Sequence, residues 1–207
     1  MKIDEARTLD RGSPELSKLI FFDTNVVQNL HSCGEFIYDS FLDPVMDAQM
    51  SARGSRFRDD MFALADFMAL GRRNGWPIAV SPGILEELGA IRQPGKRLAL
   101  TVWANELAHY CAQLRESRDA AEASCYGEVE RFTVAQRCWL SDRLAILPQE
   151  SDRQLVIDAL EHGCDVFLTM DYKTIWRYRD ELDRFGLRVM RPVELLEHVD
   201  PQAGLLR

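Results

Sequence analysis

Four short apolar segments recur along the chain, and segments with helical periodicity separate them. The apolar segments are residues 19–22, 77–80, 165–169 and 187–190. The first, Leu-Ile-Phe-Phe, is apolar at every position, which is typical of a strand buried on both faces of a parallel sheet. Strands that alternate with helices predict an α/β fold, with a mainly parallel β-sheet flanked by helices.

The region between the second and third predicted strands is long and helical. Four helices are predicted in it, over residues 82–91, 96–116, 127–142 and 151–163. Because no polar linker borders residues 96–142, we interpret them as an extra helical segment on the same domain. Residues 1–17 are a polar N-terminal extension, so residues 18–207 are predicted to form a single domain.

The composition is ordinary for a soluble globular protein, with 46% hydrophobic and 28% charged residues. No apolar run reaches the roughly 18 residues of a membrane span, and residues 1–17 offer no apolar stretch for a signal peptide. The five cysteines are scattered and form no Cys-x-x-Cys pair, which argues against a disulfide framework or a zinc site. We therefore expect a cytoplasmic protein that does not insert into a membrane.

The formal net charge of −8 argues against a nucleic-acid-binding protein, because phosphate binding normally leaves a basic footprint. A metal site built from carboxylates, however, contributes negative charge itself. Basic clusters also interrupt the acidic chain: Arg53, Arg56 and Arg58; Arg72 and Arg73; Lys96 and Arg97; Lys173, Arg177 and Arg179. One such cluster alone is more often a solvated surface. The first and last would contact phosphates if the protein bound a nucleic acid.

Carboxylates follow two of the predicted strands directly. Asp23 ends the first strand, and Asp171 comes just after the third. Ligands of open α/β sheets bind beyond the carboxyl ends of the strands, so both residues are candidates for a binding site. Capping of the following helix is the alternative role for either residue alone.

A third carboxylate, Asp152, falls within the apolar stripe of its predicted helix. Each helical residue advances by about 100°, which places Leu155 and Val156 on the same side as Asp152 and directs Asp158 away, toward solvent. A buried carboxylate is costly unless it has a partner. Capping by the helix N-terminus would relieve part of this cost, and a metal cation would relieve more.

A fourth carboxylate, Glu87, borders the apolar stripe of its helix, whereas Glu86 points nearly opposite and should be solvated. A surface glutamate is the alternative for Glu87. Four carboxylates at one edge of a sheet would repel each other, and the hard cations Mg²⁺ or Mn²⁺ would relieve that repulsion. Such a centre can lower the pKa of a bound water and stabilise the oxygens of a phosphodiester displacement.

Three segments that contain these acids resemble the PIN-domain family of nucleases. The first is LIFFDTNVV with Asp23, and the second is SPGILEELGAI with Glu87. The third, SDRQLVIDALEHGCDVFLTMD, contains Asp152 and Asp171 and is the most specific of the three. The resemblance spans about residues 19–193, in which the stretch 96–142 is longer than in compact members.

The resemblance implies a three-layer α/β/α fold and metal-dependent endonucleolytic cleavage of RNA. By the resemblance, the metal-binding catalytic residues are Asp23, Glu87, Asp152 and Asp171. Asn25 and Thr169 would be polar supports that orient a carboxylate or a water. Many members are toxins of toxin–antitoxin pairs and form homodimers, so an antitoxin protein and a second copy are candidate partners beside the RNA substrate.

Three other functions compete with this interpretation. A phosphatase of the haloacid dehalogenase type also has an Asp after its first strand, but it needs a second Asp two residues later as general acid. Asn25 stands at that position and cannot donate such a proton. A catalytically silent PIN-like scaffold that binds RNA or protein is disfavoured because all four acids are present, and a DNA-directed nuclease stays open.

Overall fold

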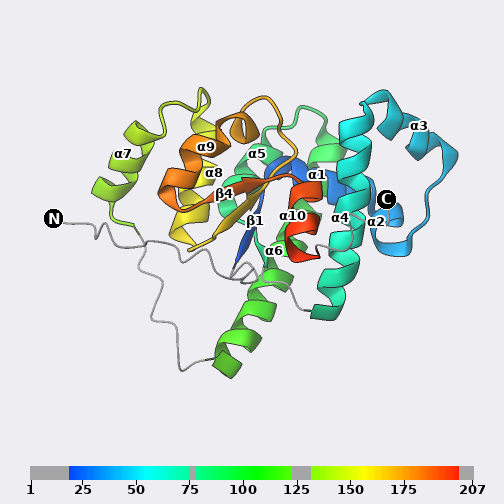
Figure 1. Ribbon diagram of the computed structural model, residues 1–207, viewed down its shortest axis with the longest axis horizontal. Coiled ribbons are helices and arrows are strands. Elements are labelled where there is room, and N and C mark those ends of the chain that lie inside the picture. The colour runs from blue at the N-terminus through cyan, green and yellow to red at the C-terminus, as the bar shows by residue number, and fades with distance from the viewer. Residues whose placement is uncertain (1–18, 75–77, 123–131, 201–207) are drawn as a thin grey trace.

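The computed structural model describes residues 19–74, 78–122 and 132–200. Its sheet has four parallel strands in the order β2-β1-β3-β4. The strands are β1 (Ile20–Phe22), β2 (Ile78–Ala79), β3 (Val166–Leu168) and β4 (Arg188–Met190). The predicted α/β fold, with a parallel sheet flanked by helices, is confirmed (Figure 1).

Strand β1 lies between β2 and β3 and is buried throughout. Ile20 pairs in register with Ile78 on one side and with Val166 on the other. Phe21 stacks on Phe167 of β3, with 5.1 Å between the ring centroids. Burial on both faces explains why the segment before Asp23 is apolar at every position.

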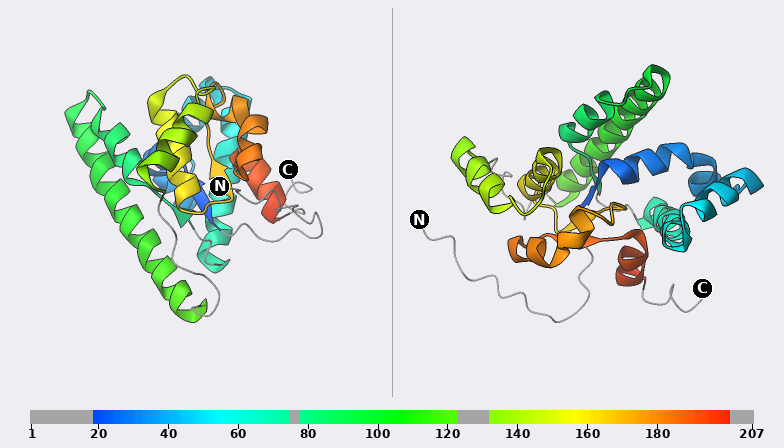
Figure 2. Two further views of the ribbon diagram at one scale, coloured as in Figure 1. Left: turned by 90° about the vertical axis from the view of Figure 1, so that its left-hand side faces the viewer. Right: turned by 90° about the horizontal axis from the view of Figure 1, so that it is seen from above.

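Helices lie on both faces of the sheet (Figure 2). On one face, α4 (Ser55–Asn74) packs against α10 (Pro192–Val199). On the other face, α5 (Pro82–Gly89) packs against α6 (Pro94–Glu122) and α8 (Glu150–Glu161). After β3, the chain reaches β4 through η1 (Ile175–Tyr178), α9 (Arg179–Leu182) and η2 (Asp183–Phe185). No helix within the described residues has the length and apolar character that a membrane span requires.

Three further helices join β1 to α4, and the sequence patterns did not predict them. They are α1 (Thr24–Ser32), α2 (Gly34–Asp39) and α3 (Pro44–Ala52). Helices this short depend on packing for their stability. The buried side chains of Val26, Val27 and Leu30 on α1, for example, join the main core.

The helical segment predicted over residues 96–142 packs against the rest of the fold in its described parts. Helix α6 contacts α5, α1 and β2, and α7 (Val134–Arg143) contacts α8. Helix α7 begins at Val134, where Thr133 and Gln136 form a capping box, and its predicted start at 127 lies outside the described residues. Residues 123–131 and the N-terminal extension 1–17 lie outside the described residues.

The strand order determines where a binding site can form. The chain leaves β1 for β2 on one side and later enters β3 on the other side of β1. The crevice of an open α/β sheet lies where the connections diverge in this way, beyond the carboxyl ends of the strands. In this protein that place is the exit of β1 and β3, where Asp23 and Asp171 follow.

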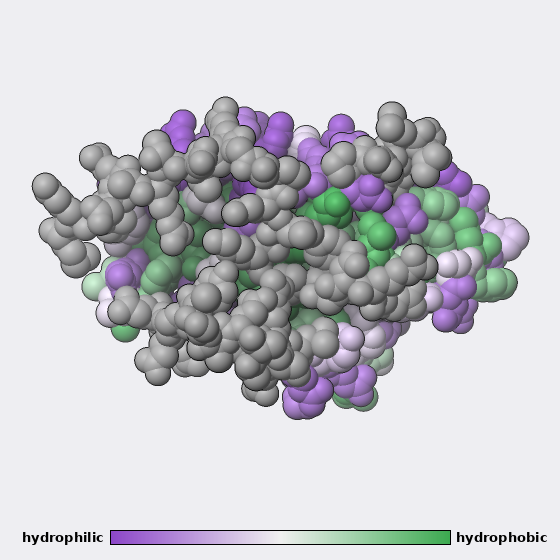
Figure 3. Space-filling model, turned by 60° about the horizontal axis from the view of Figure 1, so that its bottom comes forward, coloured by the Kyte–Doolittle hydropathy of each residue, from purple (hydrophilic) through white to green (hydrophobic). Residues whose placement is uncertain are grey.

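On the face shown in Figure 3, both hydrophobic and hydrophilic residues are visible where grey atoms do not cover the surface. Phe41, in the connection between α2 and α3, is 59% exposed. Val45, near the start of α3, is 66% exposed. Such scattered residues are common on soluble proteins and by themselves indicate no binding site.

Gly83 lets α5 approach α8 closely. A Cβ atom at this position would lie 3.0 Å from Oδ2 of Asp158 and 3.3 Å from Cδ2 of Leu155. Asp158 cannot easily yield, because Gln154 and Arg137 hold it. The distance between the two helices therefore depends on the absence of a side chain at position 83.

We expect Gly83→Ala to lower the free energy of unfolding by about 1–2 kcal/mol, because the added methyl group forces α5 away from α8. Chemical denaturation with urea measures this change. Gly89→Ala on the same helix is the matched control, because a Cβ there meets nothing within 4 Å. The control should leave the stability unchanged or raise it by up to about 1 kcal/mol through better helix propensity. Equal effects of the two substitutions would contradict the packing role of Gly83.

Candidate functional site

Asp23 sits at the junction of β1 and α1 and is 3% exposed. Its Oδ1 accepts a hydrogen bond of 2.6 Å from the backbone N–H of Thr24, and it thereby caps α1. Its Oδ2 accepts hydrogen bonds from Asn25 Nδ2 at 2.6 Å and from Thr169 Oγ1 at 2.5 Å. Asp23 is thus a helix cap, and the two predicted polar supports both contact its second oxygen.

Asn25 also ties the exits of β1 and β3 together. Its Oδ1 accepts a hydrogen bond of 2.8 Å from the backbone N–H of Met170. The backbone N–H of Asp23 donates to the carbonyl oxygen of Leu168 at 3.0 Å. These bonds fix the spacing between the two strand ends at which the acids lie.

Asp171 is held by the turn that follows it. Its Oδ1 accepts from the backbone N–H groups of Lys173 at 2.9 Å and Thr174 at 3.2 Å, and the Thr174 hydroxyl donates to its Oδ2. The backbone N–H of Asp171 donates to Thr169 Oγ1 at 2.9 Å. Thr169 therefore links Asp171 to Asp23.

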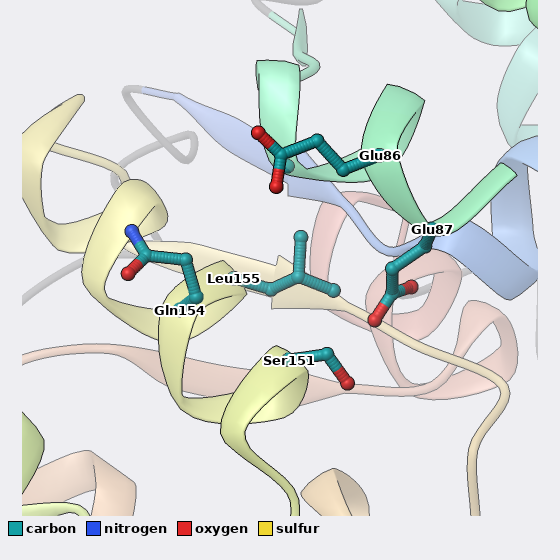
Figure 4. A pocket seen from close by; sticks show the side chains of 6 residues that line it. Glu86, Glu87, Ser151, Gln154 and Leu155 are labelled. Carbon is teal, nitrogen blue, oxygen red and sulfur yellow. The ribbon is translucent and has the colours of Figure 1, made fainter. Parts of the chain in front are cut away.

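Glu87 reaches the same region from α5. The hydroxyl of Thr24 donates to Glu87 Oε2 at 2.5 Å, so Glu87 contacts the start of α1. Glu86 is exposed, as predicted, and in Figure 4 its carboxyl group points away from Glu87. Glu87 is therefore not simply a surface glutamate, because its carboxylate is hydrogen-bonded to Thr24.

Asp152 lies in the first turn of α8 and is 8% exposed, so its predicted burial is confirmed. Its Oδ2 is buried and has no hydrogen-bond partner among the described residues. A buried carboxylate oxygen without a donor is costly. Its position therefore favours a ligand at this oxygen.

The prediction that Asp158 faces solvent is wrong. Asp158 is 7% exposed, accepts a hydrogen bond of 2.7 Å from Gln154 Nε2 and lies 3.8 Å from Arg137 Nη1. Helix α7, which supplies Arg137, covers this side of α8. The periodicity of one helix identifies its most apolar side, but it does not show whether a second helix covers another side.

Electrostatic repulsion acts between pairs of the four carboxylates. Burial, the largest cause, raises the pKa of Asp23 from 3.8 to about 7, and repulsion from Glu87 and Asp152 adds to the rise. Burial also raises the pKa of Asp152 to about 6, and repulsion from Asp171 and Glu87 contributes. Hydrogen bonding opposes both shifts only in part. An added positive charge would favour the ionised form of all these groups.

No three acidic, histidine or cysteine side chains of the described residues are grouped closely enough to form a ready metal-binding cluster. The hydrogen bonds explain this, because Thr24 holds Glu87 and Thr174 holds Asp171. The donor set nevertheless fits Mg²⁺ or Mn²⁺, which prefer oxygen ligands. The buried, unpartnered oxygen of Asp152 fits the same cation.

A cavity of about 240 Å³ opens beside the carboxylates, between α5 and α8. The residues that line it are Gly83, Glu86, Glu87, Ser151, Gln154 and Leu155 (Figure 4). In this view the Glu87 carboxyl group and the Ser151 hydroxyl group point toward each other. Of the four predicted acids, Glu87 lines this cavity, so the cavity adjoins the site at that residue.

Two hydroxyl residues of the site were not predicted as site residues from the sequence. Thr24 contacts Glu87, and Thr174 contacts Asp171 and lowers the pKa of Asp152. Thr24 lies within the Asp-Thr-Asn triplet, so the triplet could have identified it as a site residue. Thr174 follows Asp171 by three residues, a spacing that favours a side-chain-capped turn.

No protein-family model matches this chain, and neither a curated protein nor a solved structure matches it. The resemblance to the PIN-domain family therefore depends on its three sequence segments. The structural basis for a function is the geometry and electrostatics of Asp23, Glu87, Asp152 and Asp171.

Proposed function

We propose that this protein is a Mg²⁺- or Mn²⁺-dependent endoribonuclease that hydrolyses phosphodiester bonds of RNA. The observation that carries the proposal is the buried Oδ2 of Asp152, which has no hydrogen-bond partner among the described residues, on a carboxylate that Asp171 and Glu87 repel. Electrostatic repulsion within such a group is relieved by a divalent cation. The parallel sheet with helices on both faces suits the three-layer PIN-like fold that the motifs imply.

The four carboxylates would hold the cation, and hydroxyl and amide side chains would orient them. Thr169 and Asn25 direct Oδ2 of Asp23. Thr24 directs Glu87, and Thr174 directs Asp171. Oδ2 of Asp23 is thus already oriented, whereas Glu87 and Asp171 would have to turn toward a bound cation, since no three acids of the described residues form a ready cluster.

A bound divalent cation would supply a water of lowered pKa and would neutralise charge on the phosphate oxygens during the displacement. The carboxylates keep the site negative, so a polyanionic substrate is repelled when no cation is present. Asp23 and Asp152 are nearly buried, which limits the water that reaches them. The cavity beside Glu87 leaves one side open for the reacting phosphodiester.

The decisive experiment is cleavage of a mixed panel of labelled RNAs by the purified protein, with Mg²⁺, with Mn²⁺ and with EDTA. We expect cleavage with at least one of the two cations and none in EDTA. The Asp23→Asn variant should be inactive, and any cleavage that it retains would indicate a contaminating nuclease. Absence of cleavage with both cations would favour the binding-scaffold alternative. The same panel with DNA strands separates an RNA-directed from a DNA-directed nuclease.

A further inference from the structure

Arginine and aromatic side chains from separate segments meet next to Asp171. We call this surface the arginine–aromatic platform and define it as Arg56, Tyr172, Trp176, Arg179 and Arg191. The guanidinium carbon of Arg179 lies 4.1 Å from the centroid of the Trp176 ring. Those of Arg56 and Arg191 each lie 5.7 Å from the same ring and 5.6 Å from the Tyr172 ring. Three arginines thus share two aromatic rings.

Two carboxylates, the buried Asp60 and the partly exposed Glu194, hold the rings and one of the arginines in place. Trp176 Nε1 donates to Glu194 at 3.1 Å, and the Tyr172 hydroxyl donates to Asp60 Oδ2 at 2.7 Å. Asp60 is 0% exposed and also forms an ion pair of 3.0 Å with Arg191. The platform is therefore ordered before any ligand binds, which reduces the entropy cost of binding.

The platform carries positive charge that the carboxylates of the described residues neutralise only in part. Asp60 neutralises Arg191, whereas Arg179 forms a long ion pair of 3.8 Å with Asp180, whose side chain is 88% exposed, and such exposed pairs are weak. Arg56 is exposed and forms no ion pair with a carboxylate of the described residues. In a chain with a net charge of −8, this remaining positive charge indicates an anionic ligand.

The platform begins immediately beside the candidate metal site. Tyr172 follows Asp171 in the chain, and the backbone N–H of Trp176 donates to the carbonyl oxygen of Asp171 at 3.2 Å. A guanidinium that stacks on an aromatic ring keeps its N–H edge free for phosphate oxygens. A polymer with one phosphodiester at the carboxylates could therefore place neighbouring phosphates on the platform.

A single strand fits this arrangement better than a duplex. Asp23 and Asp152 are nearly buried, so a flexible strand reaches them more easily than a rigid helix does. Double-stranded-RNA-binding domains, by comparison, spread their contacts over about 16 base pairs. The platform instead concentrates its charges around two rings, close to the acids.

We propose that Arg56 and Arg179 bind backbone phosphates of single-stranded RNA on one side of the cleaved bond. The proposal rests on the proposed nuclease function and names the substrate form and the residues that position it. It also separates Arg56 from its neighbour Arg58, although the sequence places both in one basic cluster. Arg58 lies 3.0 Å from Asp47 and turns toward the Phe62 ring instead.

The test measures binding of a fluorescently labelled single-stranded RNA of about 12 nucleotides by fluorescence anisotropy. EDTA prevents cleavage during the measurement, and repulsion from the metal-free carboxylates affects the unmodified protein and all variants alike. Arg56→Gln and Arg179→Gln should each weaken binding roughly 3- to 10-fold and reduce the slope of log K against log salt by about 0.7, the contribution of one phosphate contact in a single strand. Arg58→Gln is the matched control and should change the affinity less than about twofold, because Asp47 already neutralises it.

Two further ligands show which partner the platform fits. A duplex of the same sequence should bind more weakly to the unmodified protein than the single strand does. A short polyglutamate peptide should bind poorly, and its binding should not depend on Arg56. Equal losses for RNA and polyglutamate would overturn the proposal in favour of an acidic protein partner, and equal effects of Arg56→Gln and Arg58→Gln would overturn it outright.

The binding assay separates this proposal from the nuclease proposal. If Arg56→Gln and Arg179→Gln lose RNA binding but the unmodified protein never cleaves RNA, the platform stands and the catalytic proposal fails. If RNA is cleaved and both variants bind it normally, only the platform fails. In an active enzyme the two substitutions should raise KM and leave kcat nearly unchanged, because they act on binding remote from the reacting atoms.

Discussion

Asp152→Asn is expected to reduce metal-dependent RNA cleavage by roughly 1,000-fold or more and at the same time to stabilise the metal-free protein. The loss of activity follows from removal of one negative charge from the proposed cation site. Asparagine has nearly the same shape as aspartate, so the geometry of α8 should not change. Cleavage rates with saturating Mg²⁺ or Mn²⁺ measure this effect.

The gain in stability follows from the burial of Asp152. Burial raises the pKa of this carboxyl group from 3.8 to about 6, so its charge is unfavourable in the folded protein at neutral pH. Removal of that charge should raise the free energy of unfolding by about 1–3 kcal/mol in EDTA above about pH 7. The NH₂ group of the new asparagine can take the place of Oδ2 without facing another donor, because Oδ2 of Asp152 has no hydrogen-bond partner among the described residues. Urea denaturation in EDTA measures the change.

Asp158→Asn is the matched control on the same helix. Asp158 is equally buried but lies near Arg137 and accepts a hydrogen bond from Gln154. Its substitution weakens a satisfied charge pair, so it should destabilise the protein by about 1–3 kcal/mol and leave cleavage by the remaining folded protein unchanged. If both substitutions destabilise the protein and both retain cleavage, Asp152 is a structural residue and the proposed site is wrong.

The sequence predicted those features that depend on one element at a time. The four strands were found because strands buried on both faces leave continuous apolar runs, as in residues 19–22. The exits of the strands then located Asp23 and Asp171. The burial of Asp152 followed from its place on one apolar stripe, and the structure confirms it.

Features that depend on contacts between elements were not predictable in this way. Asp158 was misplaced because α7 and the close approach of α5 at Gly83 make its side of α8 an interior side. Thr174 became part of the site through a turn that brings its hydroxyl onto Asp171. Arg56 lies against the Trp176 ring because two segments about 120 residues apart in the sequence pack together. No local sequence pattern predicts this contact.

The stability of the metal-free protein should fall as the pH rises from about 4 to about 7, and Asp23 should be a main cause. Burial raises the pKa of Asp23 to about 7, whereas the unfolded chain has the ordinary value of 3.8. Between these values the unfolded state loses its proton first and therefore binds fewer protons than the folded state. The free energy of unfolding then decreases with rising pH and becomes constant above the folded pKa.

The full span of this effect is on the order of 4 kcal/mol for Asp23, since each unit of pKa difference corresponds to about 1.4 kcal/mol. Urea denaturation in EDTA at about pH 5 and about pH 8 samples some 3 kcal/mol of it. Saturating Mg²⁺ should abolish most of the decrease, because a cation at the carboxylates favours their ionised form. Stabilisation by Mg²⁺ should therefore be larger at the higher pH.

Asp23→Asn isolates the contribution of this one group. The quantity to compare between the variant and the unmodified protein is the change in the free energy of unfolding between the two pH values, not the free energy of unfolding itself. The reason lies in the hydrogen bonds, because Oδ2 of Asp23 accepts from both Asn25 and Thr169. An amide NH₂ group at that place would face two donors, which costs stability at every pH. The decrease between the two pH values should nevertheless be smaller in the variant by about 3 kcal/mol, since asparagine does not titrate. An unchanged decrease would show that folding does not raise the pKa of Asp23, so that Asp23 is ionised in the folded protein without a cation. The repulsion that motivates the metal site would then be absent.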